Sequence, residues 1–371
     1  MLAESAVADG FEVVALDLFG DADTRRACAE WHSIGDPAGL RIDGALLLHA
    51  LETLAQRRCV IGWIAGSGFE GRPDLLESGA ALLPLIGTQA DAMRRVREPR
   101  AFFGFLDARG IPHPAVRMTA PDDARGWLVK DAHGCGGWHI RPAVSQRGGA
   151  ASEGLGTHHY FQRESSGRPM SATFIANGRD ALVLGFNELI VRPVAGRPFV
   201  FCGAVGPVPL PIELGARVTA ALRGLVAAFS LRGLGSLDFM RDGDAAEMLE
   251  VNPRPPASMV LYGHGVVAAH VRACLQGELT QWPARMANDL VEGPVRGTEV
   301  VFAPRQLWLD ESTVQHLAAR PGCHDLPMAA AGFAAGDPLC SVSARGASAG
   351  HVRELLRRGR EAVHRSLETF G

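Results

Sequence analysis

Lysine is almost absent from this chain, and the one lysine lies where phosphate chemistry would use it. Lys130 is the only lysine among 37 lysine and arginine residues. It ends an apolar stretch, residues 126–130, and a glycine-rich turn, residues 133–137, follows it. An ammonium is a compact point charge and a guanidinium is a planar fork, so a phosphate site has a chemical reason to keep one lysine in an arginine-rich chain. Chance survival in an arginine-biased composition is the alternative.

The turn after Lys130 has glycines at positions 134, 136 and 137. Without a Cβ, glycine lets successive N–H groups turn toward one point, an arrangement that binds phosphate oxygens. The turn is not a P-loop, because no GK[ST] follows it, and no acidic residue lies at the spacing of a dinucleotide-binding motif. Glycine-rich hairpin turns are common without any ligand. A phosphate site therefore needs support from elsewhere in the chain.

An acidic hairpin further along the chain supplies that support. Two apolar runs flank an Asp-Gly turn, which strongly indicates a hairpin. A turn centred near Asp244 brings Asp238 opposite Glu250, and the alternation of side chains puts Asn252 on the same face as Glu250. Two carboxylates on one face repel each other unless a cation lies between them, and these oxygen ligands suit Mg²⁺ shared with substrate phosphates. The alternative is a solvated acidic face, which the apolar neighbours argue against.

Taken in order, these features resemble the ATP-grasp superfamily. A strand ending in lysine precedes a glycine-rich loop, the segment 160–164 precedes 167–174, and the hairpin carries Leu-Glu-Val-Asn-Pro-Arg-Pro at 249–255. The last motif is the specific part. The likeness extends from about Val13 to the C-terminal helix, and it is closest to the branch of predicted ATP-dependent carboligases related to biotin carboxylase.

The resemblance implies sets of residues that bind ATP and Mg²⁺ or Mn²⁺. The phosphate contacts would be Lys130, Gly134, Gly136 and Gly137. The hinge that reads the adenine edge would be Gln162, Arg163, Glu164 and Ser165. The metal ligands would be Asp238, Glu250 and Asn252. The catalytic residues would be Lys130 and Arg254, with Arg254 near the transferred phosphoryl group or the acyl phosphate.

The sequence departs from the family pattern at two places. Many relatives carry a second lysine before the lid, and here only arginine is available, so Arg100 or Arg97 would substitute for it. Arginine can bind phosphate bidentately, so the change does not exclude activity. The hinge has Arg163 where an acidic residue is common, which leaves the ribose and adenine side-chain contacts open.

The resemblance and the hydrophobic pattern together predict an α/β chain with an ATP-grasp fold. Residues 11–18 and 59–65 are predicted strands and residues 46–55 a predicted helix, an alternation typical of a Rossmann-like sheet. Two prolines at 112 and 114 mark a linker, and residues 214–231 form a predicted amphipathic helix. The predicted parts are a Rossmann-like substrate domain at 1–112, a small β-rich lid at 113–186 that includes the turn at Asn177-Gly178, and a metal- and ATP-binding α+β domain with a terminal extension at 187–371.

The loop at residues 66–70 would lie at the carboxyl ends of the N-terminal strands, where ligands bind in such sheets. Ser67 and Glu70 would then face the substrate, with Glu70 at its polar end. Arg100 is a further candidate for substrate contact. An ordinary turn between a strand and a helix, with a surface glutamate, is the alternative for this loop.

Composition favours a cytoplasmic enzyme. With 371 residues, 47% of them hydrophobic, the chain can bury about two or three cores. A net charge of −3 and the absence of a basic run argue against nucleic-acid binding. Seven cysteines without a CxxC pair are expected to be reduced. No apolar run reaches transmembrane length, so no membrane partner is expected.

The predicted function is an ATP- and Mg²⁺-dependent ligase that forms an amide from a small carboxylate and an amine through an acyl phosphate. One alternative is a carboxylase-type enzyme that activates bicarbonate, and another is a catalytically silent ATP-binding module. A homodimer is one expected assembly. The helix predicted over residues 1–10 leads straight into a strand, so the native chain is expected either to start earlier or to lack the first strand of its sheet.

Overall fold

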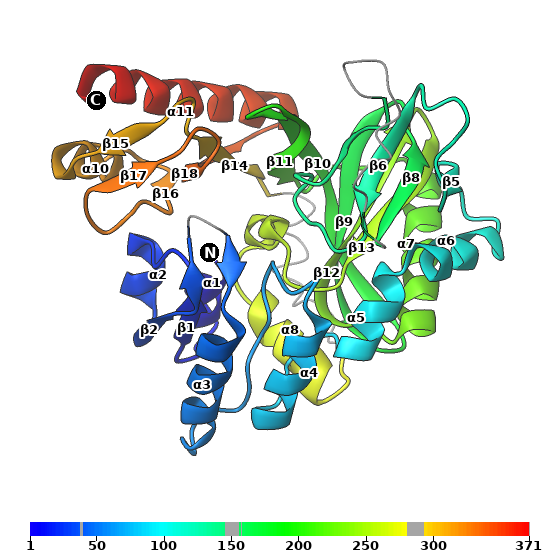
Figure 1. Ribbon diagram of the computed structural model, residues 1–371, viewed down its shortest axis with the longest axis horizontal. Helices are drawn as coiled ribbons and strands as arrows, with labels where there is room; N and C mark the ends of the chain where they lie inside the picture. Colours follow the sequence, from blue (N-terminus) through cyan, green and yellow to red (C-terminus); the bar gives the residue numbers. More distant parts are fainter. Residues whose placement is uncertain (38–39, 145–155, 157, 280–292, 371) are drawn as a thin grey trace.

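The computed structural model describes residues 1–37, 40–144, 156, 158–279 and 293–370. These residues form an N-terminal α/β part, a small antiparallel sheet and a large antiparallel sheet (Figure 1). The large sheet lies between helices, and the small sheet lies beside one end of it, as Figure 1 shows. The residues predicted from the sequence to bind phosphate and metal lie where these parts meet.

The N-terminal part is small, and its sheet is short. Its elements are α1 (Leu2–Ala8), β1 (Val14–Asp17), α2 (Ala22–Ala27), β2 (Glu30–Ser33), β3 (Gly35–Asp36), β4 (Arg41–Ile42), α3 (Gly44–Ala55) and α4 (Pro73–Leu82). Strands β1 and β2 are parallel, as predicted for a Rossmann-like sheet. The predicted helix at 46–55 is confirmed by α3, which begins after Asp43 because this carboxylate accepts hydrogen bonds from the N–H groups of Ala45 and Leu46.

The strand predicted at residues 59–65 is wrong in its extent. In the described structure this segment forms only a one-residue parallel bridge, between Trp63 and Leu85. The reason is that the Val60 N–H turns back to the Arg57 carbonyl oxygen (3.2 Å), so this amide cannot join a strand ladder. The bridge still carries the chain into the loop at residues 66–70.

Two helices connect the N-terminal part to the small sheet. They are α5 (Ala90–Arg97) and α6 (Pro99–Asp107). Proline disfavours a helical residue before it, so α5 ends at Arg97 and Glu98 caps the next helix by accepting from the N–H groups of Arg100 and Ala101. This break leaves the Arg97 side chain at the last position of α5, next to the small sheet.

The small sheet lies within residues 113–186, the range predicted for the lid. Its strands are β5 (Val116–Arg117), β6 (Trp127–Asp131), β7 (Arg141–Pro142) and β8 (His159–Arg163), in the order β5-β8-β6-β7. Val129, Ala143 and Phe161 form its own small core. The apolar stretch that ends in Lys130 forms most of β6, so the predicted strand is confirmed, and the order of the sheet places it between β8 and β7.

The large sheet has eight strands in the order β13-β12-β9-β10-β11-β14-β18-β16. Their bounds are β9 (Arg168–Asn177), β10 (Ala181–Val194), β11 (Arg197–Gly206), β12 (Arg232–Asp242), β13 (Ala245–Asn252), β14 (Val295–Phe302), β16 (Cys323–His324) and β18 (Pro338–Gly346). Helix α7 (Ile212–Phe229) packs on one face, against Phe174 and Phe239. The 3₁₀ helix η1 (Ala257–Tyr262) and α8 (Val266–Leu275) pack on the other, against Ile175 and Leu234.

The predicted boundary of the lid at residue 186 does not match this sheet. Residue 186 lies inside β10, and both β9 and β10 belong to the large sheet. Strand β9 pairs with β12 on one side and β10 on the other, and most of its residues are buried, so it is a central strand. The predicted turn at Asn177-Gly178 connects β9 to β10 and is part of the large sheet, and the strands of the small sheet end at Arg163.

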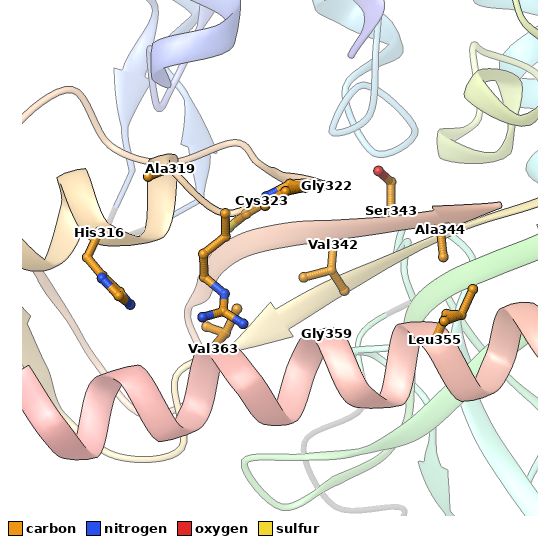
Figure 2. A pocket seen from close by; sticks show the side chains of 12 residues that line it. His316, Ala319, Gly322, Cys323, Val342, Ser343, Ala344, Leu355, Gly359 and Val363 are labelled. Atoms are coloured by element: carbon orange, nitrogen blue, oxygen red, sulfur yellow. The ribbon is translucent and has the colours of Figure 1, made fainter.

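The C-terminal part extends the large sheet. Its strands β14, β18 and β16 belong to that sheet, whereas β15 (Leu307–Leu309) and β17 (Ala331–Phe333) pair in a separate two-stranded sheet, and its helices are α10 (Glu311–Ala318) and α11 (Ala349–Phe370). A cavity of about 540 Å³ opens between α10, β16, β18 and α11 and is lined by residues such as His316, Cys323, Ser343 and Leu355 (Figure 2). None of the site residues predicted from the sequence lines this cavity. Within the described part of the chain, every helix is too short or too polar to span a lipid bilayer.

Candidate active site

The acidic hairpin is formed by β12 and β13, with Asp238 directly opposite Glu250 as predicted. The last pair before the turn is Asp242 and Ala245, so the turn is centred slightly before Asp244, the predicted centre. A bulge offsets this shift in register. On the turn side of the bulge, Phe239 pairs with Met248, so Leu249 is the extra residue that no partner faces. The bulge thus places the two carboxylates opposite each other.

The environment of the two carboxylates favours a cation. Burial and then the charge of Glu250 raise the pKa of Asp238 to about 7. Burial also acts to raise the pKa of Glu250, but Arg97 and Lys130 outweigh it, so this pKa is lowered. Asn252 donates its amide N–H to Asp238 Oδ2 (3.0 Å), so its amide oxygen is the atom that remains as a ligand. A divalent cation would relieve the like-charge repulsion, and this set of oxygen donors fits Mg²⁺.

Lys130 brings an ammonium to the carboxylates from the small sheet. It lies opposite Tyr160 near the end of β6, and only 3% of the residue is exposed. Burial lowers its pKa, whereas the negative charges of Glu250 and Asp238 act in the opposite direction. A buried ammonium needs anions close by, and nucleotide phosphates would provide them.

Arg97 is the arginine that the structure brings to the site. Its Nη1 lies 3.4 Å from Glu250 Oε2, its Nε donates to the Ala132 carbonyl oxygen (2.9 Å), and its Nη2 donates to the Gly134 carbonyl oxygen (2.6 Å). The side chain is 6% exposed. Arg100, three residues later, lies exposed on α6. Of the two arginines proposed to replace the second lysine, Arg97 therefore has the suitable position.

The glycine-rich loop between β6 and β7 packs against the large sheet. Gly136 and Gly137 have φ angles of 65° and 79°, which favour glycine. The Phe201 N–H donates to the Gly136 carbonyl oxygen (2.9 Å), and a Cβ on Gly137 would lie 1.9 Å from the Phe199 carbonyl oxygen. Glycine at 137 is thus required for close contact with β11.

Glu70 forms a buried ion pair with Arg254, which follows the acidic hairpin. Arg254 Nε donates to Glu70 Oε1 (2.9 Å), and the Gly68 N–H donates to Glu70 Oε2 (2.8 Å). The Glu70 side chain is 1% exposed and the Arg254 side chain is 12% exposed. Burial alone would raise the pKa of Glu70, but attraction to Arg254 outweighs it and lowers the pKa. Glu70 is therefore not the surface glutamate of an ordinary turn.

The hinge contains buried polar atoms that lack a partner among the described residues. Gln162 Nε2 and Ser165 Oγ are both buried without a hydrogen bond. The N–H groups of Arg163 and Glu164 are used inside the lid, by the carbonyl oxygens of Ala115 and Gly126, respectively. The Arg163 side chain is exposed. An adenine ring at the hinge would supply partners for the two orphaned atoms, so these residues fit a nucleotide.

Sequence reasoning missed two features of the site. It treated Glu70 as a substrate contact and did not predict its pairing with Arg254, which is far away in the sequence. It also passed over His139, whose buried Nδ1 has no partner in the described structure. An imidazole close after a glycine-rich turn is the only indication the sequence offers for it. Ser67 is exposed on the loop at 66–70.

Comparison with known proteins identifies the fold. Residues 100–258 match the family model of the ATP-grasp domain. This chain contains an ATP-grasp domain. The match covers the glycine-rich loop, the residues predicted for the hinge and the acidic hairpin, so the predicted ATP-grasp domain and the predicted fold are confirmed. No curated protein matches the sequence.

Solved structures of the same fold cover nearly the whole of this chain. The N5-carboxyaminoimidazole synthase of Aspergillus clavatus, in complex with ADP and 5-aminoimidazole ribonucleotide, is 15% identical with a TM-score of 0.67, covering 98% of this chain and 95% of that one. The biotin carboxylase domain dimer of Hydrogenobacter thermophilus 2-oxoglutarate carboxylase, with MgADP, ADP and bicarbonate, is 12% identical with a TM-score of 0.69, covering 97% and 86%. Rhizobium etli pyruvate carboxylase is 16% identical with a TM-score of 0.68, covering 96% of this chain, which spans only 35% of that enzyme.

Proposed function

We propose that this protein is an ATP- and Mg²⁺-dependent ligase that joins a small carboxylate to an amine through an acyl phosphate. A carboxylate oxygen takes the terminal phosphoryl group of ATP, and ADP leaves. The amine nitrogen then attacks the acyl carbon, phosphate leaves, and the nitrogen loses a proton. The single observation that carries this proposal is that three cations surround the paired carboxylates of the hairpin: Arg97 contacts Glu250, and the charges of Lys130 and Arg254 act to lower the pKa of both Asp238 and Glu250.

The residues of the site have separate tasks in this scheme. Lys130 and the N–H groups of the glycine-rich loop would hold the phosphates, and Gln162 and Ser165 would contact the adenine. Phosphoryl transfer needs little covalent help from a protein, so catalysis rests on positioning and on charge stabilisation. Asp238, Glu250 and Asn252 would hold Mg²⁺, which neutralises charge on the transferred phosphoryl group.

Arg254 is suited to bind the carboxylate substrate. Glu70 holds its Nε, and its Nη1 donates to the Pro255 carbonyl oxygen (3.3 Å), so the guanidinium has one fixed orientation. Its remaining N–H groups are then available for an anionic oxygen. The charge of Glu70 keeps Arg254 stable before substrate arrives, because a buried guanidinium without an anion is costly.

Bicarbonate is the second candidate acceptor of the phosphoryl group. The observation that favours it is the likeness to a biotin carboxylase domain that holds MgADP and bicarbonate and to an N5-carboxyaminoimidazole synthase. Bicarbonate and an organic acid both present a carboxylate-type oxygen, so the same cations would serve either. The small-molecule amine, cytoplasmic location and homodimer assembly are further parts of the proposal.

Hydroxylamine separates these functions. It converts an acyl phosphate of an organic acid into a stable hydroxamate, whereas carboxyphosphate decays to carbon dioxide and phosphate. With Mg²⁺-ATP and a panel of small acids, we expect ADP release together with a hydroxamate of one acid, formed without added bicarbonate. ADP release that requires bicarbonate and gives no hydroxamate would favour the carboxylase. No ADP release with bicarbonate or with any acid and amine tested would favour the binding module.

A further inference from the structure

His139 is a partly buried imidazole near the site that none of the roles above uses. It lies in the loop between β6 and β7, two residues after Gly137, and its Nδ1 is buried with no hydrogen-bond partner in the described structure. An unsatisfied buried polar atom costs free energy, on the order of 1–3 kcal/mol, so this orphaned Nδ1 atom points to a ligand that would satisfy it.

The position of His139 is fixed by a glycine. A Cβ on Gly134 would lie 2.2 Å from His139 Cγ and 2.4 Å from Nδ1, so the ring packs directly on the Gly134 backbone. The carbonyl oxygen of Gly134 accepts from Arg97, which in turn contacts Glu250. The imidazole is thus joined through one glycine and one arginine to the metal-binding carboxylates.

The charges around His139 place it at the metal end of the phosphate site. Burial lowers the pKa of its imidazole, and the nearby charges that act on it are those of Glu250, Lys130, Arg97 and Asp131. This lowered pKa favours the uncharged imidazole at neutral pH. In its Nδ1-protonated tautomer it has one N–H to donate, without adding another charge beside the two cations.

We propose that His139 is a further catalytic residue, which donates a hydrogen bond from Nδ1 to the terminal phosphoryl group of ATP. This inference rests on the proposed function, because it requires that ATP bind at this site. The terminal group is assigned because Glu250 and its cation would lie at that end of the triphosphate, whereas the hinge lies at the adenine end.

The assignment predicts discrimination between nucleotides that differ only in this group. In the full chain with Mg²⁺, replacing His139 by phenylalanine fills the space of the ring and removes the donor. We expect β,γ-methylene ATP to bind about 10- to 100-fold more weakly, the range for a hydrogen bond to a charged group. ADP should bind with less than about a twofold change, because it lacks the terminal phosphoryl group. Calorimetric titration measures both affinities.

Two matched variants make the test specific. His139→Asn puts an amide N–H close to the position of Nδ1 and should restore most of the affinity for β,γ-methylene ATP. His32→Phe changes an exposed imidazole on β2, outside the glycine-rich loop, and should leave both affinities unchanged.

Three results would overturn the assignment of His139. They are equal losses for both nucleotides, an unchanged affinity for β,γ-methylene ATP in His139→Phe, or an asparagine variant as weak as the phenylalanine variant. If His139→Phe does not fold, His139→Asn and His139→Ala give the same comparison with and without a donor. A wild-type protein that binds neither nucleotide would instead refute the proposed function itself, and with it this inference.

Discussion

The Arg97 guanidinium lies 3.4 Å from the Glu250 carboxylate and also donates to the Gly134 carbonyl oxygen at 2.6 Å. This one side chain connects the end of α5, the glycine-rich loop of the small sheet and the acidic hairpin of the large sheet. These three parts carry most of the proposed phosphate and metal contacts. Arg97 therefore keeps the loop and the carboxylates in a fixed relative position before any nucleotide binds.

Arg97→Lys should lower turnover on the order of a hundredfold, about 3 kcal/mol of transition-state stabilisation. Lysine keeps the charge but cannot form the three contacts of the planar fork. ADP release under saturating ATP measures the effect. Arg100→Lys is the matched control, because Arg100 is exposed on α6, and it should leave turnover nearly unchanged. Similar losses in both variants would contradict the role of Arg97.

Lys130→Ala should also reduce turnover about a hundredfold, through lost stabilisation of phosphate charge. The protein should stay folded, as circular dichroism would show. Lys130→Arg should restore only part of the rate, because a guanidinium is larger and this side chain is almost fully buried. Wild-type turnover in Lys130→Ala would refute the assignment.

Glu250→Gln should abolish Mg²⁺-dependent ADP release. Glutamine keeps the shape of the side chain but removes the charge that a divalent cation needs. The control is Asp242→Asn, which removes a carboxylate from the exposed turn of the same hairpin and should leave ADP release intact. Equal loss in the two variants would instead indicate general damage to the hairpin.

Glu70→Gln should destabilise the protein by about 3–5 kcal/mol, because it leaves the Arg254 guanidinium buried without its counter-charge. The free energy of unfolding in urea measures this loss. The double variant Glu70→Gln with Arg254→Gln removes both charges and should recover most of the stability. A double variant as unstable as the single one would argue against the ion pair as the cause.

The stability provided by the Glu70–Arg254 pair should depend on pH. The pKa of Glu70 is lowered in the folded state, below its ordinary value of 4.5. The contribution is then complete above that ordinary value and is lost as the pH falls through the folded pKa. The difference in unfolding free energy between wild type and Glu70→Gln should be constant near neutral pH and shrink in acid. A difference that grows in acid would contradict this sign.

The sequence predicted the local chemistry better than the extent of the elements. Lys130, the glycine-rich turn and the acidic hairpin are local patterns, so periodicity and turn residues were sufficient to find them. The exact facing of Asp238 and Glu250 depends on a bulge at Leu249, which side-chain alternation alone does not predict. The lid boundary was wrong because β9 and β10 join the large sheet through long-range pairing, and short strands look alike in either sheet.

Long-range contacts account for the remaining differences at the site. Whether Arg97 or Arg100 reaches the carboxylates is decided by the helix break at Pro99, which turns one inward and leaves the other exposed. Arg254, the partner of Glu70, lies 184 residues later in the sequence, so no local pattern connects the two residues. The role proposed for His139 depends on its packing against Gly134 and on its buried Nδ1, which has no partner among the described residues. Neither feature can be predicted from the local sequence.

The central claim is that Lys130 and the hairpin carboxylates form one site for Mg²⁺ and ATP, and calorimetric titration with ATP tests it most directly. Wild type should bind ATP, and Mg²⁺ should tighten binding on the order of tenfold or more, about 1.4 kcal/mol of coupling. Glu250→Gln should keep binding of ATP without Mg²⁺ and lose the tightening. A wild-type protein that binds no ATP, or a Glu250→Gln variant with the full Mg²⁺ effect, would contradict the account.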